Sequence, residues 1–195
     1  MKKNNLILKA LILIFSIQLG AGTVNKSPAD PREYNTFFLK NGIEVITVSD
    51  PELATSAATL SVGVGAFQDP EGAQGIAHFL EHMIFMGSKK YKSPNEYMEF
   101  ISQNGGSTNA FTAAEQTTYL FSINSKQFAP ALDRLSSAIK APLFDGTMVE
   151  KEINAVNSEW LKNRQTDGFI QQRTLALTGN PSHPRVKLGV GNKDT

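Results

Sequence analysis

The chain has 195 residues and no cysteine, and 41% of its residues are hydrophobic and 9% aromatic. This composition is that of a globular domain, and it excludes a disordered chain, a collagen-like repeat and a disulfide-stapled miniprotein. The 19 basic and 18 acidic residues leave a net charge of +1, which gives no general attraction to phosphate backbones, so nucleic acid is not an expected partner.

Residues 1–22 form a basic and apolar leader. Lysines at positions 2, 3 and 9 precede an apolar run over residues 10–19, and small residues follow it. This pattern predicts a secretory signal peptide. The run is well short of the roughly 20 residues that span a bilayer, so a stable membrane anchor is the weaker alternative. We therefore expect export, to the periplasm where the cell has an outer membrane, with a polar linker over residues 23–34 and a domain over residues 35–195.

Strand signals dominate the next part of the chain. Asn41-Gly42 lies between the strand-like runs 35–40 and 43–48 and predicts a hairpin. A third strand is expected over residues 57–67, where Gly63 and Gly65 indicate close approach of a neighbouring backbone. An apolar, largely buried helix is expected over 73–86, stopping at Gly87. A second helix is expected to open with Ser93 as N-cap, Pro94 at the first helical position and Glu96 closing a capping box with Ser93. A second hairpin is expected over 108–112 and 117–123.

The last third of the chain predicts helices. One helix over residues 128–140 places Leu132, Leu135, Ala138 and Ile139 on a single face. Asp145 is the expected N-cap of a longer helix, with a bend expected near residues 166–168 and an end at Gly179. Residues 180–195 read as a loop. Hairpins with helices inserted between them predict an α+β domain with a mainly antiparallel sheet.

The chemistry-bearing motif is His78-Phe-Leu-Glu81-His82 on the apolar helix. Positions i, i+3 and i+4 share one helix face, so two imidazoles can reach one tetrahedral zinc while the carboxylate acts on a metal-bound water. This order of residues is the inverted zincin motif. A purely structural cluster is the alternative, but burying two imidazoles and a carboxylate is costly unless a metal or a partner compensates them.

A catalytic zinc needs a third protein donor. Glu152 and Glu159 are two helical turns apart and share a face, so one can bind the metal while the other hydrogen-bonds a ligating histidine. The residues alone leave open which glutamate does which. His183 is a further candidate, but it lies in a proline-flanked loop with no geometric relation to the helix.

Six ordered segments carry a family resemblance: residues 78–91, 95–97, 105–112, 152–159, 178–184 and 189–193. They resemble the pitrilysin/insulysin zinc metalloendopeptidases, which are inverted zincins of peptidase family M16. The likeness extends from about residue 35 to the end of the chain. The last two segments are similar to the insulysin, pitrilysin and nardilysin branch in particular.

The resemblance implies a zinc-dependent endopeptidase acting on peptides and small unfolded polypeptides. It implies that His78, His82 and Glu159 bind one zinc ion and that Glu81 is the general base that activates a zinc-bound water. Glu152 then supports a ligating histidine. The resemblance also implies that the substrate backbone pairs with an edge strand, with shallow pockets giving preference. The implied substrate-binding residues are Asn109, Ala110, Phe111 and Phe169, the two aromatic residues lining one pocket.

Relatives of this branch resemble four related α+β domains, and this sequence stops inside the first. We therefore expect the chain to be a fragment or a truncated product that holds the zinc ligands but cleaves peptides poorly or not at all by itself. Its expected partners are the remaining domains of the full-length enzyme. One alternative is a non-catalytic peptide-binding or scaffold subunit of the same fold. The complete set of metal ligands argues against it, because a scaffold does not need them. The other is a structural metal site, which would normally have four protein ligands, often cysteines.

Overall fold

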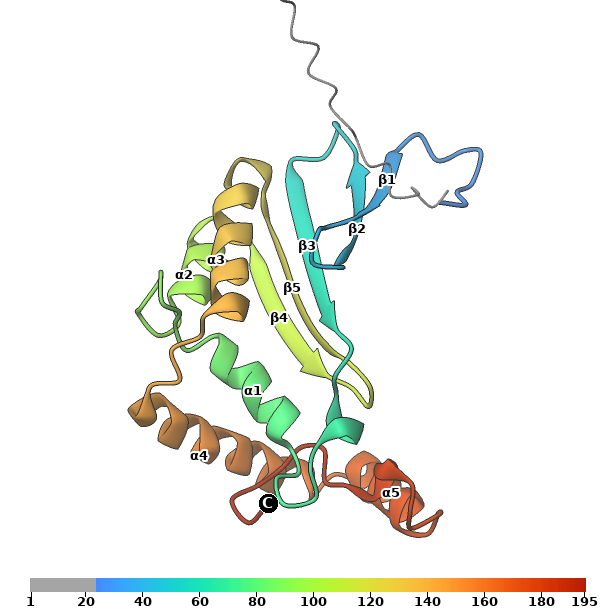
Figure 1. Cartoon of the computed structure of the whole chain (residues 1–195), viewed down its shortest axis with the longest axis vertical. Coiled ribbons are helices and arrows are strands. Elements are labelled where there is room, and N and C mark those ends of the chain that lie inside the picture. The colour runs from blue at the N-terminus through green and yellow to red at the C-terminus, as the bar shows by residue number, and fades with distance from the viewer. Residues whose placement is uncertain (1–23) are drawn as a thin grey trace, which may run out of the picture. The chain divides into compact units, whose positions relative to one another are not determined.

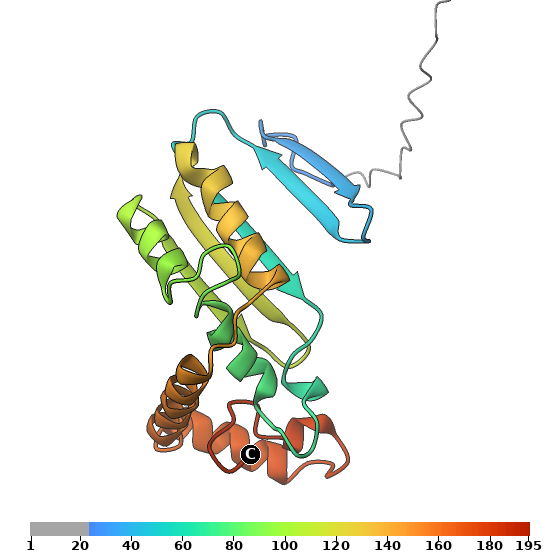
Figure 2. The same ribbon diagram turned by 60° about the vertical axis from the view of Figure 1, so that its left-hand side comes forward.

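The computed structural model describes residues 24–195, and this part of the chain divides into two compact units, the first ending at Leu53 and the second beginning at Ala54. The predicted signal peptide lies outside the described residues. Within the described part of the chain, no helix has the length and apolar character needed to cross a membrane. Figures 1 and 2 show the elements in two views.

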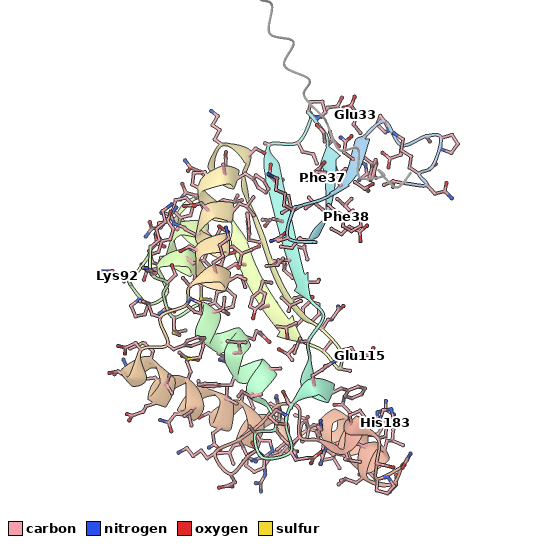
Figure 3. The ribbon with its side chains drawn as sticks, in the orientation of Figure 1. Glu33, Phe37, Phe38, Lys92, Glu115 and His183 are labelled. Atoms are coloured by element: carbon pink, nitrogen blue, oxygen red, sulfur yellow. The ribbon has the colours of Figure 1, made fainter. Side chains whose placement is uncertain are left out.

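The first unit contains the predicted hairpin, which the structure confirms. Strand β1 (Glu33–Phe38) pairs antiparallel with β2 (Glu44–Ser49). The strand thus begins two residues before the expected start of the domain. In the turn, Gly42 takes a left-handed φ of 86°, a conformation that glycine adopts without steric cost. Both phenylalanines at the end of β1 are exposed (Figure 3).

The second unit is built on an antiparallel sheet of order β3-β5-β4, which confirms the α+β prediction. The central strand β5 (Thr117–Asn124) pairs with β3 (Thr55–Val62) on one side and β4 (Ser107–Thr112) on the other. Helices α2 (Glu96–Gln103) and α3 (Phe128–Lys140) cover one face of this sheet (Figures 1 and 2). The fully buried apolar side chains include Ile101, Phe121, Ile123 and Leu135.

The third strand is shorter than predicted. It ends at Val62, and residues Ala66–Gln68 form a short 3₁₀ helix, η1. The backbone amides of its first two residues, Ala66 and Phe67, donate to the carbonyl oxygens of the β4–β5 turn instead of continuing the ladder. Gly65 makes the predicted close approach, since a Cβ there would lie 2.4 Å from the Ala113 oxygen. The same prediction for Gly63 is wrong, because nothing lies within 4 Å of a Cβ at that position.

Helices α1 and α2 differ from expectation at their ends and faces. Helix α1 spans Ile76–Ile84, and Ile76 and Leu80 are 48% and 42% exposed, so the predicted burial on nearly all sides is wrong. Helix α2 begins at Glu96, later than predicted. Its N-cap is Asn95, at a φ of 63°, and no side chain caps the helix. The expected capping box does not form, because Glu96 binds an arginine of α3 instead.

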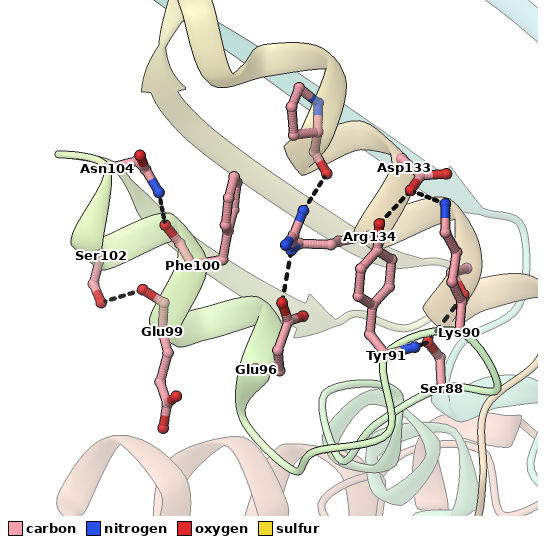
Figure 4. Close-up of polar contacts among 12 residues, drawn as sticks. Ser88, Lys90, Tyr91, Glu96, Glu99, Phe100, Ser102, Asn104, Asp133 and Arg134 are labelled. Atoms are coloured by element: carbon pink, nitrogen blue, oxygen red, sulfur yellow. Dashed lines mark hydrogen bonds and ion pairs between the residues drawn. The ribbon is translucent and has the colours of Figure 1, made fainter.

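Arg134 of α3 joins α2 and the loop before it to α3 (Figure 4). Its Nε donates to Glu96 Oε1 at 2.9 Å, and its guanidinium carbon lies 3.6 Å and 4.5 Å from the ring centres of Phe100 and Tyr91. The neighbouring Asp133 accepts from the Tyr91 hydroxyl. These contacts join helix α2 and the loop before it to α3.

The helices of the last third agree closely with the prediction. Helix α3 has the predicted bounds, although Leu132, placed on its buried face, is 42% exposed. Asp145 caps α4 (Gly146–Asn163) by accepting from two backbone amides, as predicted. The expected bend is a break, after which α5 runs over Asp167–Leu177. A loop follows, with a short 3₁₀ turn, η3, over Pro184–Val186.

Candidate metal centre

Helices α1 and α4 bring His78, His82 and Glu159 together. Glu159 Oε2 lies 3.6 Å from His78 Nε2 and 3.7 Å from His82 Nε2, and one donor atom from each residue lies within 4.8 Å of the others. Donors around a tetrahedral zinc with bonds of about 2.0–2.2 Å are separated by roughly 3.3–3.6 Å. The two separations between Glu159 and the histidines are close to this range, and the widest separation within the group is at most 4.8 Å.

The Nδ1 atoms of both histidines are occupied, which turns both Nε2 atoms toward Glu159. His82 Nδ1 lies 2.9 Å from Glu152 Oε2, and His78 Nδ1 lies 2.8 Å from the Val190 carbonyl oxygen. The geometry thus separates the two glutamates that the sequence left open: Glu159 faces the donor atoms and Glu152 faces the far side of a ring. Sequence reasoning missed the Val190 carbonyl, because a backbone oxygen has no side-chain signature.

Glu81 shares the helix with both histidines and is 8% exposed. Its Oε2 accepts a hydrogen bond from the Thr112 hydroxyl at 2.7 Å. This bond fixes the position of one of the two carboxylate oxygens. Thr112 ends strand β4 in the segment that carries the family resemblance, yet sequence reasoning gave it no role, since only the fold brings it to Glu81.

The donor set is open to solvent on one side. The side chains of His78 and His82 are 13% and 25% exposed, whereas that of Glu159 is 41% exposed. A closed structural zinc site has four protein donors, and a catalytic one keeps a position open. In the described part of the chain, these three residues are the group of His, Asp and Glu donors spaced to hold a metal.

His183, the alternative third donor, does not join this group. Its Nδ1 accepts from the Arg185 amide at 3.1 Å, and its ring packs edge-on against Phe67 with 5.4 Å between ring centres. The residue lies on the loop near α5 (Figure 3). The proline-flanked loop therefore has a structural role here.

The residues expected to bind substrate belong to strand β4 and helix α5. Asn109, Ala110 and Phe111 belong to β4, which pairs with β5 on one side only and is an edge of the described sheet. Phe111 is 45% exposed. Phe169 lines a cavity of about 440 Å³ that His78, Thr112 and Glu159 also line, whereas Phe111 does not.

Comparisons of the sequence relate the chain to a family of peptidases. The model of the insulinase family, peptidase family M16, matches residues 44–182. Insulin-degrading enzyme of Homo sapiens is 45% identical over 172 residues, which are 88% of this chain and 17% of that protein. Protease 3 of Escherichia coli (strain K12) is 43% identical over 173 residues, 89% of this chain and 18% of that protein.

Solved structures show the same relationship. The crystal structure of pitrilysin matches with a TM-score of 0.83 at 43% identity, over 87% of this chain and 18% of that one. A protease from Helicobacter pylori shares the fold at a TM-score of 0.75 and 21% identity. The chain spans less than a fifth of the length of the two curated relatives, at 17% and 18%.

Proposed function

The chain belongs to the insulinase family of peptidases, family M16, and from this premise we propose that it is the zinc-binding part of an endopeptidase for peptides and small unfolded polypeptides. The observation that carries the proposal is the convergence of His78, His82 and Glu159 within 4.8 Å on an open face. When bound by these donors, zinc supplies a Lewis acid that acidifies a coordinated water and polarises a peptide carbonyl.

Glu81 is the proposed proton carrier. Thr112 donates to its Oε2, so Oε1 is the atom that takes a proton from the attacking water and returns it to the leaving amine. Burial of the carboxylate within α1 limits competition from bulk water. Glu152 keeps His82 oriented through the bond to Nδ1.

The edge strand β4 is the proposed docking site for the substrate backbone. An extended peptide adds to such an edge through main-chain hydrogen bonds, which give affinity with little dependence on sequence. Asn109, Ala110 and Phe111 supply this edge, and Phe169 offers an apolar wall to a substrate side chain in the neighbouring cavity. The partners proposed to complete substrate binding are the other domains of a full-length enzyme.

Export of the protein is a further part of the proposal, and the leader sequence supports it. N-terminal sequencing of the secreted protein tests whether the leader is removed.

Metal analysis tests the proposal directly. The chain from residue 23 is expected to bind about one zinc ion, and Glu159→Ala is expected to lose it, because only two donors remain. An unchanged zinc content in Glu159→Ala would contradict the ligand set. In a complete parent enzyme, Glu81→Gln should keep zinc and lose turnover. A parent enzyme that binds zinc and peptide without turnover would instead favour the scaffold alternative.

A further inference from the structure

We propose that residues 187–191, the positioning segment, fix the ring of His78 so that its Nε2 faces the metal. The inference rests on the proposed function and adds a part to the same site. The Val190 carbonyl oxygen lies 2.8 Å from His78 Nδ1. A carbonyl oxygen can only accept a hydrogen bond, so Nδ1 carries the proton and Nε2 of the neutral ring keeps its lone pair.

The positioning segment is bound to the chain just before α1. Lys187 Nζ donates to the carbonyl oxygens of Phe67 at 2.9 Å and Asp69 at 2.6 Å. The Leu188 amide donates to Gln74 Oε1 at 2.7 Å. An ammonium bond to a carbonyl is charge-assisted and stronger than a neutral one. These three bonds hold the segment on both sides of the turn that leads into α1.

Asp69 connects the positioning segment to the helix itself. Its side chain is almost fully buried, and its carboxylate accepts from the Gly75 amide at 2.7 Å and the Ala77 amide at 3.0 Å. Gly75 is the N-cap of α1 and Ala77 lies in its first turn, where unpaired donors need a partner. The same residue thus binds Lys187 through its backbone and α1 through its side chain. His78 lies in this first turn, so its position follows from the same contacts.

A glycine pair allows the final approach. Gly75 and Gly191 have φ values of 91° and 70°, and a Cβ on Gly75 would lie 2.3 Å from the Gly191 Cα. No residue with a side chain fits at that separation. Because Val190 directly precedes Gly191, this contact sets how near the Val190 carbonyl comes to His78.

The two histidines therefore depend on acceptors of different kinds. His82 is oriented by a carboxylate that one substitution removes, whereas His78 is oriented by a main-chain group that moves only with its segment. Leu188 and Val190 also line the cavity beside the metal donors. The positioning segment thus forms both a wall of that cavity and the support of a ligand.

Lys187→Met removes the ammonium and keeps most of the side-chain length. In the metal-free chain from residue 23, at a pH where the rings are neutral, ¹H–¹⁵N ring spectra are expected to show His78 with its proton on Nδ1. In Lys187→Met we expect a shift toward the Nε2–H form and a zinc affinity, measured by chelator competition, that is roughly 10- to 100-fold weaker. Lys187→Arg keeps a cationic donor and is expected to keep the parent ring spectrum and zinc affinity. Lys193 is exposed in the same loop, and Lys193→Met is expected to change neither the ring spectrum nor the zinc affinity.

A second route moves the segment through its backbone. Gly191→Ala places a Cβ 3.0 Å from the Gly75 Cα at a φ of 70° and is expected to change the His78 spectrum in the same direction. Gly72→Ala is its control, since nothing lies within 4 Å of that added Cβ. If Lys187→Met fails to fold, judged by circular dichroism, the Gly191→Ala spectrum decides.

Two results would overturn the inference. One is a parent protein in which the His78 proton resides on Nε2. The other is a folded variant, either Lys187→Met or Gly191→Ala, with an unchanged ring spectrum and unchanged zinc affinity. The ring spectrum is recorded without metal, so a parent chain that binds no zinc contradicts the proposed function while the spectrum still tests the positioning segment.

Discussion

Replacing Glu152 by leucine removes the acceptor of His82 Nδ1 and is expected to weaken zinc binding by one to two orders of magnitude. The two atoms are 2.9 Å apart, and the side chains are only 15% and 25% exposed, so water replaces this bond poorly. Removing such a support costs about 10- to 100-fold in metal affinity, which corresponds to about 1.4–2.7 kcal/mol. Glu152→Gln keeps an acceptor oxygen without the charge and is expected to fall between the parent and the leucine variant.

Chelator competition measures the zinc dissociation constant, and thermal unfolding at saturating zinc gives an independent reading. Because zinc binds the folded chain, the loss in binding free energy lowers the stabilisation by saturating zinc by the same amount. For a unit of this size, this loss corresponds to a decrease of roughly 3–10 °C in Tm. Glu150→Leu is the matched control, because Glu150 is an exposed residue of the same helix. A folded Glu152→Leu protein that binds zinc as tightly as the parent would refute the reasoning.

Three further perturbations test other parts of the unit. Thr112→Val removes the hydrogen-bond donor to Glu81 and is expected to lower kcat of a complete parent enzyme roughly 10-fold or more with zinc retained, because a hydrogen bond to a charged group contributes about 1.5–3 kcal/mol. Thr112→Ser should keep activity. Full activity in the valine variant would argue against a role of Thr112 in holding Glu81. Gly65→Ala places a Cβ 2.4 Å from a backbone oxygen, so urea unfolding is expected to show about 1–3 kcal/mol of lost stability. Gly63→Ala has open space and should match the parent; equal losses in both contradict the packing argument. Burial raises the pKa of Tyr119 to about 12, so the fold favours the neutral phenol. The contribution of the neutral phenol to stability is complete below the ordinary tyrosine pKa of about 10 and is lost as the pH rises to 12. Urea unfolding between these pH values is expected to show that Tyr119→Phe loses less unfolding free energy than the parent as the pH rises. An equal loss in both proteins would exclude Tyr119 ionisation as the cause.

The sequence predicts the parts of the fold that are encoded by local patterns. The bounds of α3 follow from its periodicity, and Asp145 caps α4 as its side chain and position indicate. The spacing of His78, Glu81 and His82 places all three on one helix because helix geometry is fixed. These features need no knowledge of distant contacts.

The features that the sequence does not predict depend on residues that are far apart in the chain. Glu96 has the spacing of a capping box, but Arg134 offers a charged partner that wins over a neutral backbone amide. The Thr112 hydroxyl reaches Glu81 only because β4 ends above α1. Val190 contributes a carbonyl, a group that every residue has, so only the flanking glycines hint at its role.

The position of the donors gives the proposed zinc a second consequence. Helix α4 has one buried residue, Val156, and burying a valine contributes about 1.5–3 kcal/mol. Zinc bound between α1 and α4 would add to this, because the binding free energy of a metal that binds only the folded site contributes to folding stability. A catalytic ion held by these three donors would therefore also join the two helices. Zinc-dependent stability then cannot separate a catalytic site from a structural one, and the Glu81→Gln variant, which leaves every donor in place, is the change that does.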